Sequence, residues 1–226
     1  MTEVTYAFKY VTIILVCTAS KCTTRARVTG RKSGERSIMK KVIIPEGTKE
    51  ICCGTIPEDV TECIIPNTVR EIGGLAFFHC KSLKAITIPK GVNRIGDYAF
   101  LGCTGLEEVI LPEGITEIGH GTFKWCSSLK YLVIPSGITK IDEHVFNGCT
   151  TLKSIFLPSE VRTIGDGAFS LCSSLEYVSF PSGITEIGDW SFFGCVKLKN
   201  VVIPGTPKIS DTAFYGCSIS LKVIQP

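Results

Sequence analysis

The twelve cysteines are the most conspicuous residues of this 226-residue chain that could do chemistry. An even number of cysteines would allow a disulfide framework in a secreted protein. Seven of them, however, recur every 23 residues, with a last interval of 22: Cys80, Cys103, Cys126, Cys149, Cys172, Cys195 and Cys217. Stacked side chains that point the same way have poor geometry for bridging. We therefore expect seven reduced, structural thiols, and this spacing leaves the redox compartment of the protein open.

No other group of residues has the spacing of a catalytic or metal site. Cys52, Cys53 and Cys63 lack a CxxC pair or a fourth ligand, and Cys63 occupies an apolar core position of its repeat. The histidines lack the i,i+4 spacing of a metal-binding helix, so we expect them on the surface: His79, His120 and His144. Nucleophile-elbow, P-loop and dinucleotide-binding motifs do not occur. The sequence therefore predicts no metal, no cofactor and no enzymatic activity.

The cysteine interval belongs to a tandem repeat, which prolines mark most plainly. They recur every 23 residues: Pro66, Pro89, Pro112, Pro135, Pro158, Pro181 and Pro204. Alignment on them gives the unit LxxIxIPxxVxxIGxxAFxxCxS, which is nearly complete from Leu83 to Gly105 and again over Leu175–Val196. A period of this length indicates a solenoid rather than a globular domain.

Each unit combines two local patterns. Apolar residues alternate at Ile86 and Ile88 before a proline, which predicts a short strand with one buried face. An AFxxC-like segment follows, often opened by a Gly-Asp pair such as Gly165-Asp166. The aspartate can cap a single helical turn, and the glycine can supply a positive φ or a close backbone approach. We therefore expect a strand and a short helical turn in every unit.

Such a unit cannot bury its own apolar face, so neighbouring units must stack around one continuous core. Apolar residues make up 44% of the chain, enough for a substantial core. The predicted fold is an α/β repeat, a solenoid with a parallel β-sheet on its concave face and short helical turns on the other side. Residues 66–226 are the tandem repeats, and residues 39–65 form a degenerate capping repeat that lacks the AFxxC segment. The sequence ends within a strand unit, which predicts an open edge and allows edge-to-edge self-association.

The unit resembles the BspA-type, or Treponema pallidum-type, leucine-rich repeat. The resemblance is close over residues 66–226 and loose over 39–65, and it rests on seven tandem copies. It implies a solenoid of the kind found in bacterial surface proteins and in expanded families of anaerobic protists, where attachment to host or matrix proteins is the role usually proposed. It implies no catalytic residues and does not identify a ligand. The function must therefore come from the exposed positions.

The third and fifth positions of each repeat flank the buried strand residue and should face outward on the concave sheet. Tyr131, Val133, Phe156 and Tyr177 come from three successive strands and should form an apolar and aromatic patch. Aromatic and β-branched residues also favour strands for their own sake, which is the alternative explanation. The interaction hypothesis makes this patch a protein-binding surface, with two polar residues at its margin: Glu108 and Asn200.

The first forty residues differ from the repeats. Residues 1–20 contain the apolar run Tyr10–Cys17, which fits either a secretory signal peptide with a poor positive leader or an extra strand on the first repeat. Residues 21–38 read as an exposed basic linker, and residues 21–41 carry eight bases and one acid. Such a segment could attach to acidic polymers, but no aromatic residues interleave to support nucleic-acid binding. Membrane contact is expected only through the N-terminal segment, if at all.

These features predict a non-enzymatic protein-binding solenoid. The first hypothesis is a surface or secreted adhesion-type protein that engages a host, matrix or cellular protein, which requires residues 1–20 to be a signal peptide or an anchor. The alternatives are a cytoplasmic scaffold that uses the same concave face and an assembly subunit that stacks through its open edge.

Overall fold

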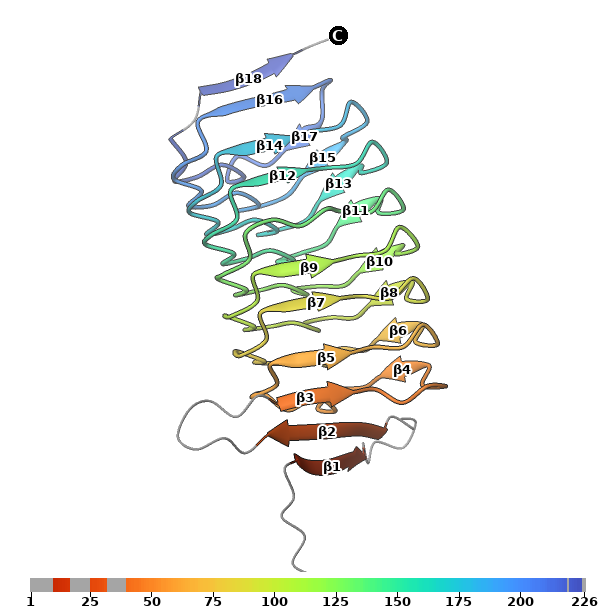
Figure 1. Cartoon of the computed structure of the whole chain (residues 1–226). Coiled ribbons are helices and arrows are strands. Elements are labelled where there is room, and N and C mark those ends of the chain that lie inside the picture. The colour runs from red at the N-terminus through yellow and green to blue at the C-terminus, as the bar shows by residue number, and fades with distance from the viewer. Residues whose placement is uncertain (1–9, 17–24, 32–39, 219, 225–226) are drawn as a thin grey trace, which may run out of the picture.

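The computed structural model describes residues 10–16, 25–31, 40–218 and 220–224, and every regular element among them is a β-strand (Figure 1). An N-terminal antiparallel hairpin consists of β1 (Tyr10–Val16) and β2 (Arg25–Arg31). The longer strands of the repeats are β3 (Lys40–Ile43), β5 (Glu62–Ile64), β7 (Ala85–Thr87), β9 (Glu108–Ile110), β12 (Ser154–Phe156), β14 (Tyr177–Ser179), β16 (Asn200–Pro204) and β18 (Ser220–Ile224). The two-residue strands are β4 (Glu50–Ile51), β6 (Glu71–Ile72), β8 (Arg94–Ile95), β10 (Glu117–Ile118), β11 (Lys140–Ile141), β13 (Thr163–Ile164), β15 (Glu186–Ile187) and β17 (Lys208–Ile209).

Two rows of parallel strands run along the solenoid (Figure 1). We call the row of longer strands the long-strand face and the row of two-residue strands the short-strand face. The register follows the repeat, because Ser154 lies opposite Tyr177 and Phe156 opposite Ser179. Within a long strand the middle residue, such as Ile86, is buried and its neighbours are exposed. The predicted parallel sheet is therefore present, and the short-strand face is a second row that the sequence analysis did not anticipate.

The predicted short helical turns are absent from the described residues, which is a correction to the expected fold. The AFxxC segments instead form turns whose amides bond to the next rung: the N–H of Phe100 donates to the carbonyl of Thr122 at 2.9 Å. Tyr98 in the same segment has a φ of 56°, which no right-handed helix allows. We call this side the turn face. Its amides alternate between two kinds of bond, because the N–H of Leu101 donates to the carbonyl of Tyr98 in its own turn at 3.0 Å while that of Phe100 donates to the next rung.

The Gly-Asp pairs also act between rungs rather than as helix caps. The carboxylate of Asp166 accepts the N–H of Asp189 in the next rung at 2.7 Å. A Cβ at Gly188 would lie 2.4 Å from that same carboxylate oxygen, so the glycine is needed for the close approach. The expectation of a close backbone approach is therefore confirmed, whereas the expected cap on a helical turn is wrong.

A column of phenylalanine rings forms the centre of the core. Rings of successive rungs stack nearly parallel, 5–14° apart in plane, with centroids 4.8–5.7 Å apart: Phe77, Phe100, Phe123, Phe146, Phe169, Phe192 and Phe214. Leucine, isoleucine and valine side chains from the strands surround this column. Offset-stacked rings add to the stabilisation that burial of their area provides.

Beside this column, the ladder cysteines satisfy backbone carbonyls. The thiol of Cys126 donates to the carbonyl of Phe100 at 3.2 Å, and the thiol of Cys149 donates to that of Phe123 at 3.3 Å. The same carbonyl of Phe100 also accepts the N–H of Cys103 in its own turn. A buried carbonyl with two lone pairs thus receives two donors. The predicted structural role of these cysteines is therefore confirmed by their contacts.

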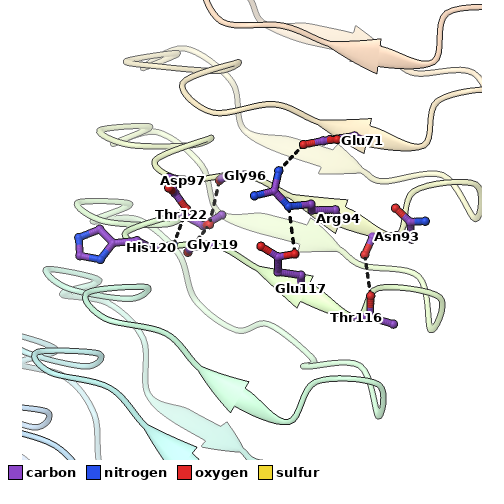
Figure 2. Close-up of polar contacts among 10 residues, drawn as sticks. All are labelled: Glu71, Asn93, Arg94, Gly96, Asp97, Thr116, Glu117, Gly119, His120 and Thr122. Atoms are coloured by element: carbon purple, nitrogen blue, oxygen red, sulfur yellow. Dashed lines mark hydrogen bonds and ion pairs between the residues drawn. The ribbon is translucent and has the colours of Figure 1, made fainter.

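Polar side chains connect the rungs of the short-strand face (Figure 2). Arg94 bridges the carboxylates of Glu71 and Glu117, with 3.0 Å between its Nε and Glu117 Oε2, and these carboxylates raise the pKa of the guanidinium. The hydroxyl of Thr122 donates to the carbonyls of Gly96 and Gly119 at 3.2 and 2.7 Å. Because such exposed ion pairs each contribute about 0–1 kcal/mol, they align rungs more than they stabilise them.

The N-terminal hairpin pairs with the first repeat, since β2 runs antiparallel to β3. The apolar run Tyr10–Cys17 therefore contains a strand, β1, as one of its two interpretations predicted. This pairing does not test its removal as a signal peptide. The exposed basic linker expected over residues 21–38 is wrong for Arg25–Arg31, which form β2. Pairing with β2 covers the backbone edge that β3 would otherwise expose. No helix in the described part of the chain is long and apolar enough to cross a membrane.

The short-strand face is interrupted at one rung, and one of the several breaks that divide the long-strand face lies at the same rung. On the short-strand face, β10 and β11 belong to separate four-stranded sheets. On the long-strand face, Tyr131 joins the sheet only through one bridge to Glu108. Asp142 occupies the position at which glycine stands in other rungs, such as Gly119 and Gly165. The turn face continues across this rung, because Phe123 N–H still donates to the carbonyl of residue 145 at 2.9 Å.

Candidate protein-binding surfaces

The predicted patch lies on the long-strand face with its side chains in solvent. Tyr131 is 54% exposed, Val133 70%, Phe156 65% and Tyr177 49%. The alternation that predicted their outward direction is visible at Ile155, which is fully buried between two outward neighbours. Apolar and aromatic side chains this exposed are the kind of surface that marks interaction sites.

Contacts at the patch orient its three aromatic side chains. The rings of Phe156 and Tyr177 lie 5.6 Å apart at 50°. The hydroxyl of Tyr131 donates to Glu108 Oε1 at 2.9 Å, and this carboxylate raises the pKa of the phenol. Glu108 therefore lies at the margin of the patch, as its position predicted. The strand bearing Asn200 runs beside β14, but its side chain lies outside the described ones.

Sequence reasoning gave too little weight to the N-terminal half of the same face. Ile64 and Ile110 are 43% and 51% exposed, and between them lies a shallow hollow of about 900 Å³ over β5, β7 and β9. Short side chains form the floor of this hollow, because Ala85 and Thr87 are the outward residues of β7. The missed signal was this pair of short side chains between two larger apolar ones.

The turn face carries a second set of exposed aromatic residues, which sequence reasoning missed. Trp125 is 51% exposed, Trp190 46% and Tyr215 65%. Both tryptophans have positive φ, 60° and 56°, in positions where other rungs have glycine. A left-handed conformation costs a non-glycine residue about 1–2 kcal/mol. The signal in the sequence is that large residues and glycines alternate from one rung to the next. This happens at two positions of the turn segment, which lie four residues apart.

The cysteines and histidines are the side chains whose types could do chemistry in this chain. Burial raises the pKa of Cys172 to about 12, so its thiol is not a ready nucleophile. Cys52 is disulfide-bonded. The rings of His120 and His144 lie 5.3 Å apart on the turn face, and both are half-buried. Among the described residues, no group of three or more side chains is arranged to hold a metal ion.

Two solved structures share this architecture at the level of both fold and sequence. A leucine-rich repeat protein from Eubacterium ventriosum is 28% identical with a TM-score of 0.71, covering 80% of this chain and 49% of its own. A leucine-rich repeat protein from Bacteroides ovatus is 28% identical with a TM-score of 0.55, covering 84% of this chain and 67% of its own. The chain thus spans about half the length of the first of these proteins. A search of curated proteins finds no relative.

The model of the BspA type leucine-rich repeat region matches this chain over residues 57–174 and 93–221, with six copies. These ranges contain the proline register, the phenylalanine column and the cysteine ladder described above. The chain therefore belongs to the BspA-type leucine-rich-repeat family.

Proposed function

We propose that this protein is a surface or secreted adhesion-type protein that binds a partner protein through its long-strand face. The observation that carries the proposal is the exposed patch of Tyr131, Val133, Phe156 and Tyr177. Membership of a leucine-rich-repeat family supports it, because such repeats generally mediate protein–protein interaction and are typically non-enzymatic. We extend that general role to this patch.

The charges around the patch favour a protein partner over a nucleic acid. Lys84 and Lys130 both pair with Glu107, at 3.6 and 2.6 Å, so these lysines are balanced by an acid. At the N-terminal end of the same face, Lys41 pairs with Glu62 at 2.7 Å. Nucleic-acid binding needs an excess of positive charge that neutralises phosphates. An apolar and aromatic centre with a charge-balanced rim is instead typical of protein interfaces.

A triple substitution tests the patch. Tyr131, Phe156 and Tyr177 are half or more in solvent, so replacing all three by alanine should leave the fold intact, as circular dichroism can verify. Immobilised wild type and variant are exposed in parallel to extracellular-matrix and cell-envelope proteins, and a retained protein is purified and titrated. We expect the triple variant to bind it about 100-fold more weakly, since aromatic hot spots each contribute more than about 1 kcal/mol.

The matched control replaces polar residues on the same strand positions, Thr87→Ala and Ser179→Ala, and should keep wild-type affinity. If every retained partner binds the triple alanine variant as tightly as the wild type, the patch reflects strand propensity alone. Equal losses in both variants would also contradict the proposal, because they would point to a general property of the sheet.

Export is the part of the proposal that separates an adhesin from a cytoplasmic scaffold. A disulfide at Cys52 would accompany export, since disulfides persist in oxidising compartments. The protein is recovered from its own cells and alkylated in denaturant without prior reduction. Its intact mass then shows both whether the N-terminus has been cleaved and how many thiols are free. We expect a mass that lacks about twenty N-terminal residues, the length of a signal peptide. A full-length mass with all twelve cysteines alkylated would favour the scaffold.

A further inference from the structure

Three aromatic side chains meet on the turn face of the last two described turns. The Trp190 ring is perpendicular to both others, at 76° to Phe193 and 72° to Tyr215, with centroids 5.3 and 5.7 Å away. Phe193 and Tyr215 are nearly parallel, 6.1 Å apart. We call these three residues the aromatic corner. It lies on a different face of the solenoid from the patch on the long strands.

Trp190 differs from Tyr98 and His144, which share its repeat position and its positive φ. Tyr98 and His144 lie against a glycine of the next rung, since a Cβ at Gly121 or Gly167 would come within 2.5 Å of their rings. In the rung after Trp190 the corresponding residue is Thr212, whose hydroxyl accepts the N–H of Trp190 at 3.3 Å. The backbone strain at Trp190 is therefore not explained by packing on glycine. Strained residues of this kind are concentrated at binding sites.

The surroundings of the corner are acidic. Asp189 precedes Trp190 in the chain and lines a hollow of about 370 Å³ together with Asp166, Glu186 and Asp211. The single base in this hollow, Lys208, pairs with Glu186 at 3.2 Å. Hydroxyl groups of Ser210 and Thr212 donate to Asp189 and lower the pKa of its carboxyl, which keeps it charged. The charge beside the aromatic corner therefore suits a cation.

The chain itself contains a related pairing at its other tryptophan. The ammonium of Lys124 lies over the ring of Trp125, 5.4 Å from its centroid. In the rung of Trp190 the residue that corresponds to Lys124 is Phe193, so the chain supplies no cation from that position. Trp125 thus has an internal cation, whereas the corner combines ring faces with nearby acids.

We propose that the aromatic corner of Trp190, Phe193 and Tyr215 binds an arginine or lysine side chain from a basic segment of a partner protein. The cation lies against the ring faces, where their quadrupoles attract it. Neighbouring positive charges of the same segment lie along Asp189 and Asp211. This site is distinct from the surface in the proposed function and does not depend on it.

Tryptophan fluorescence allows a direct test, because the chain has two tryptophans and Trp125→Gly leaves Trp190 as the single reporter. The probe is a synthetic peptide of alternating arginine and glycine, and its control has citrulline, a neutral isostere, at each arginine. We expect a saturable change with the arginine peptide and about tenfold weaker binding of the citrulline peptide. Binding should weaken as ionic strength rises from about 0.01 M to about 1 M.

Variants then assign the site by calorimetry with the same peptide. Trp190→Gly relieves the positive φ while removing the ring, so the fold should persist and binding should fall about tenfold or more. Tyr215→Ala should also weaken binding, by about fivefold. Trp125→Gly is the matched control, because it makes the same change at a ring that Lys124 already covers, and it should bind as the wild type does.

Three results would overturn the proposal. The first is equal affinity for the citrulline and arginine peptides. The second is wild-type affinity in Trp190→Gly, and the third is a loss of affinity in Trp125→Gly as large as that in Trp190→Gly. A neutral oligosaccharide that displaces the arginine peptide would identify a glycan site instead. Self-association that the arginine peptide reverses would identify a second copy of this chain, through its own basic residues 21–41, and would replace the partner-protein proposal.

Discussion

The ladder cysteine shows how a single side chain links two rungs. Its thiol donates to the phenylalanine carbonyl of the preceding rung at 3.0–3.3 Å for six successive cysteines from Cys103 to Cys217. The carbonyl lies in a turn and already accepts one N–H, so a weak second donor of small volume is what the site can accommodate. Burial rather than oxidation therefore explains why so many cysteines occur in this chain.

At the residue scale we predict that the buried ladder thiols resist alkylation in the folded protein. Burial raises the pKa of Cys149 and Cys172, the latter to about 12, so little thiolate is present at pH 8 and reagents have no access. We expect these two to be labelled only after denaturant unfolds the chain, and the half-buried Cys217 to react earlier. Peptide mass spectrometry over time measures the rates. Equal labelling of all three in the native state would contradict the buried ladder.

At the scale of one structural element, the turn segment combines a large residue in one rung with a glycine in the next. The Tyr98 ring lies so close to Gly121 that a Cβ there would be 2.5 Å from it, and Trp125 is placed in the same way over Gly148. Both glycines also have positive φ, 57° and 76°. Backbone conformation therefore favours glycine at these positions, and ring packing is a second, independent reason for it.

This coupling can be measured with a double-mutant cycle. Gly121→Ala should lower the free energy of unfolding by more than the roughly 1–2 kcal/mol of a left-handed alanine, because the Tyr98 ring must also move. In a Tyr98→Gly background the same change should cost only the backbone part. Gly114→Ala is the control, since its Cβ would meet nothing closer than 3.6 Å. Equal costs in both backgrounds, measured by urea unfolding, would exclude the ring contact.

At the scale of the whole molecule, the short-strand face is divided at one rung. No backbone hydrogen bond among the described residues joins β10 to β11, and the stacked rings of Phe123 and Phe146 are the farthest apart, at 5.7 Å. Asp142 replaces the glycine that lets neighbouring rungs approach closely, and its carboxylate accepts the N–H of Glu143 in its own rung at 2.7 Å. In the last rung Ser210 occupies the same position, and its N–H still donates to the carbonyl of Ile187 in the preceding rung. The break therefore follows from the aspartate and not from the presence of any side chain at this position.

We predict that the two halves of the solenoid unfold in separable steps. Repeat proteins are stabilised mainly by neighbouring interfaces, so a weak interface lowers cooperativity across it. Amide hydrogen exchange should be faster at Asp142 than at Gly119 and Gly165, whose amides donate to the preceding rung at 2.8 Å. Asp142→Gly should slow exchange there and sharpen the urea transition. Uniform exchange along the repeats, unchanged in this variant, would show that the interruption has no energetic consequence.

The sequence by itself determined the repeat, its register and the direction of most side chains. The interval between Pro89 and Pro112 fixes one rung, and alternation around Ile86 decides which residues face the core, because both depend only on local periodicity. The outward patch of Tyr131, Phe156 and Tyr177 followed from the same rule. The binding role of this patch stays a prediction.

Only the tertiary structure decided what happens between rungs. The turn segment containing Tyr98 reads locally as a helical turn, but stacking offers alternate amides, such as that of Phe100, a partner in the next rung, and these bonds replace helical ones. The aromatic corner at Trp190 and the interruption at Asp142 likewise depend on residues about 23 positions away. Such contacts arise from how successive turns of the chain lie on one another, which no pattern within a single repeat specifies.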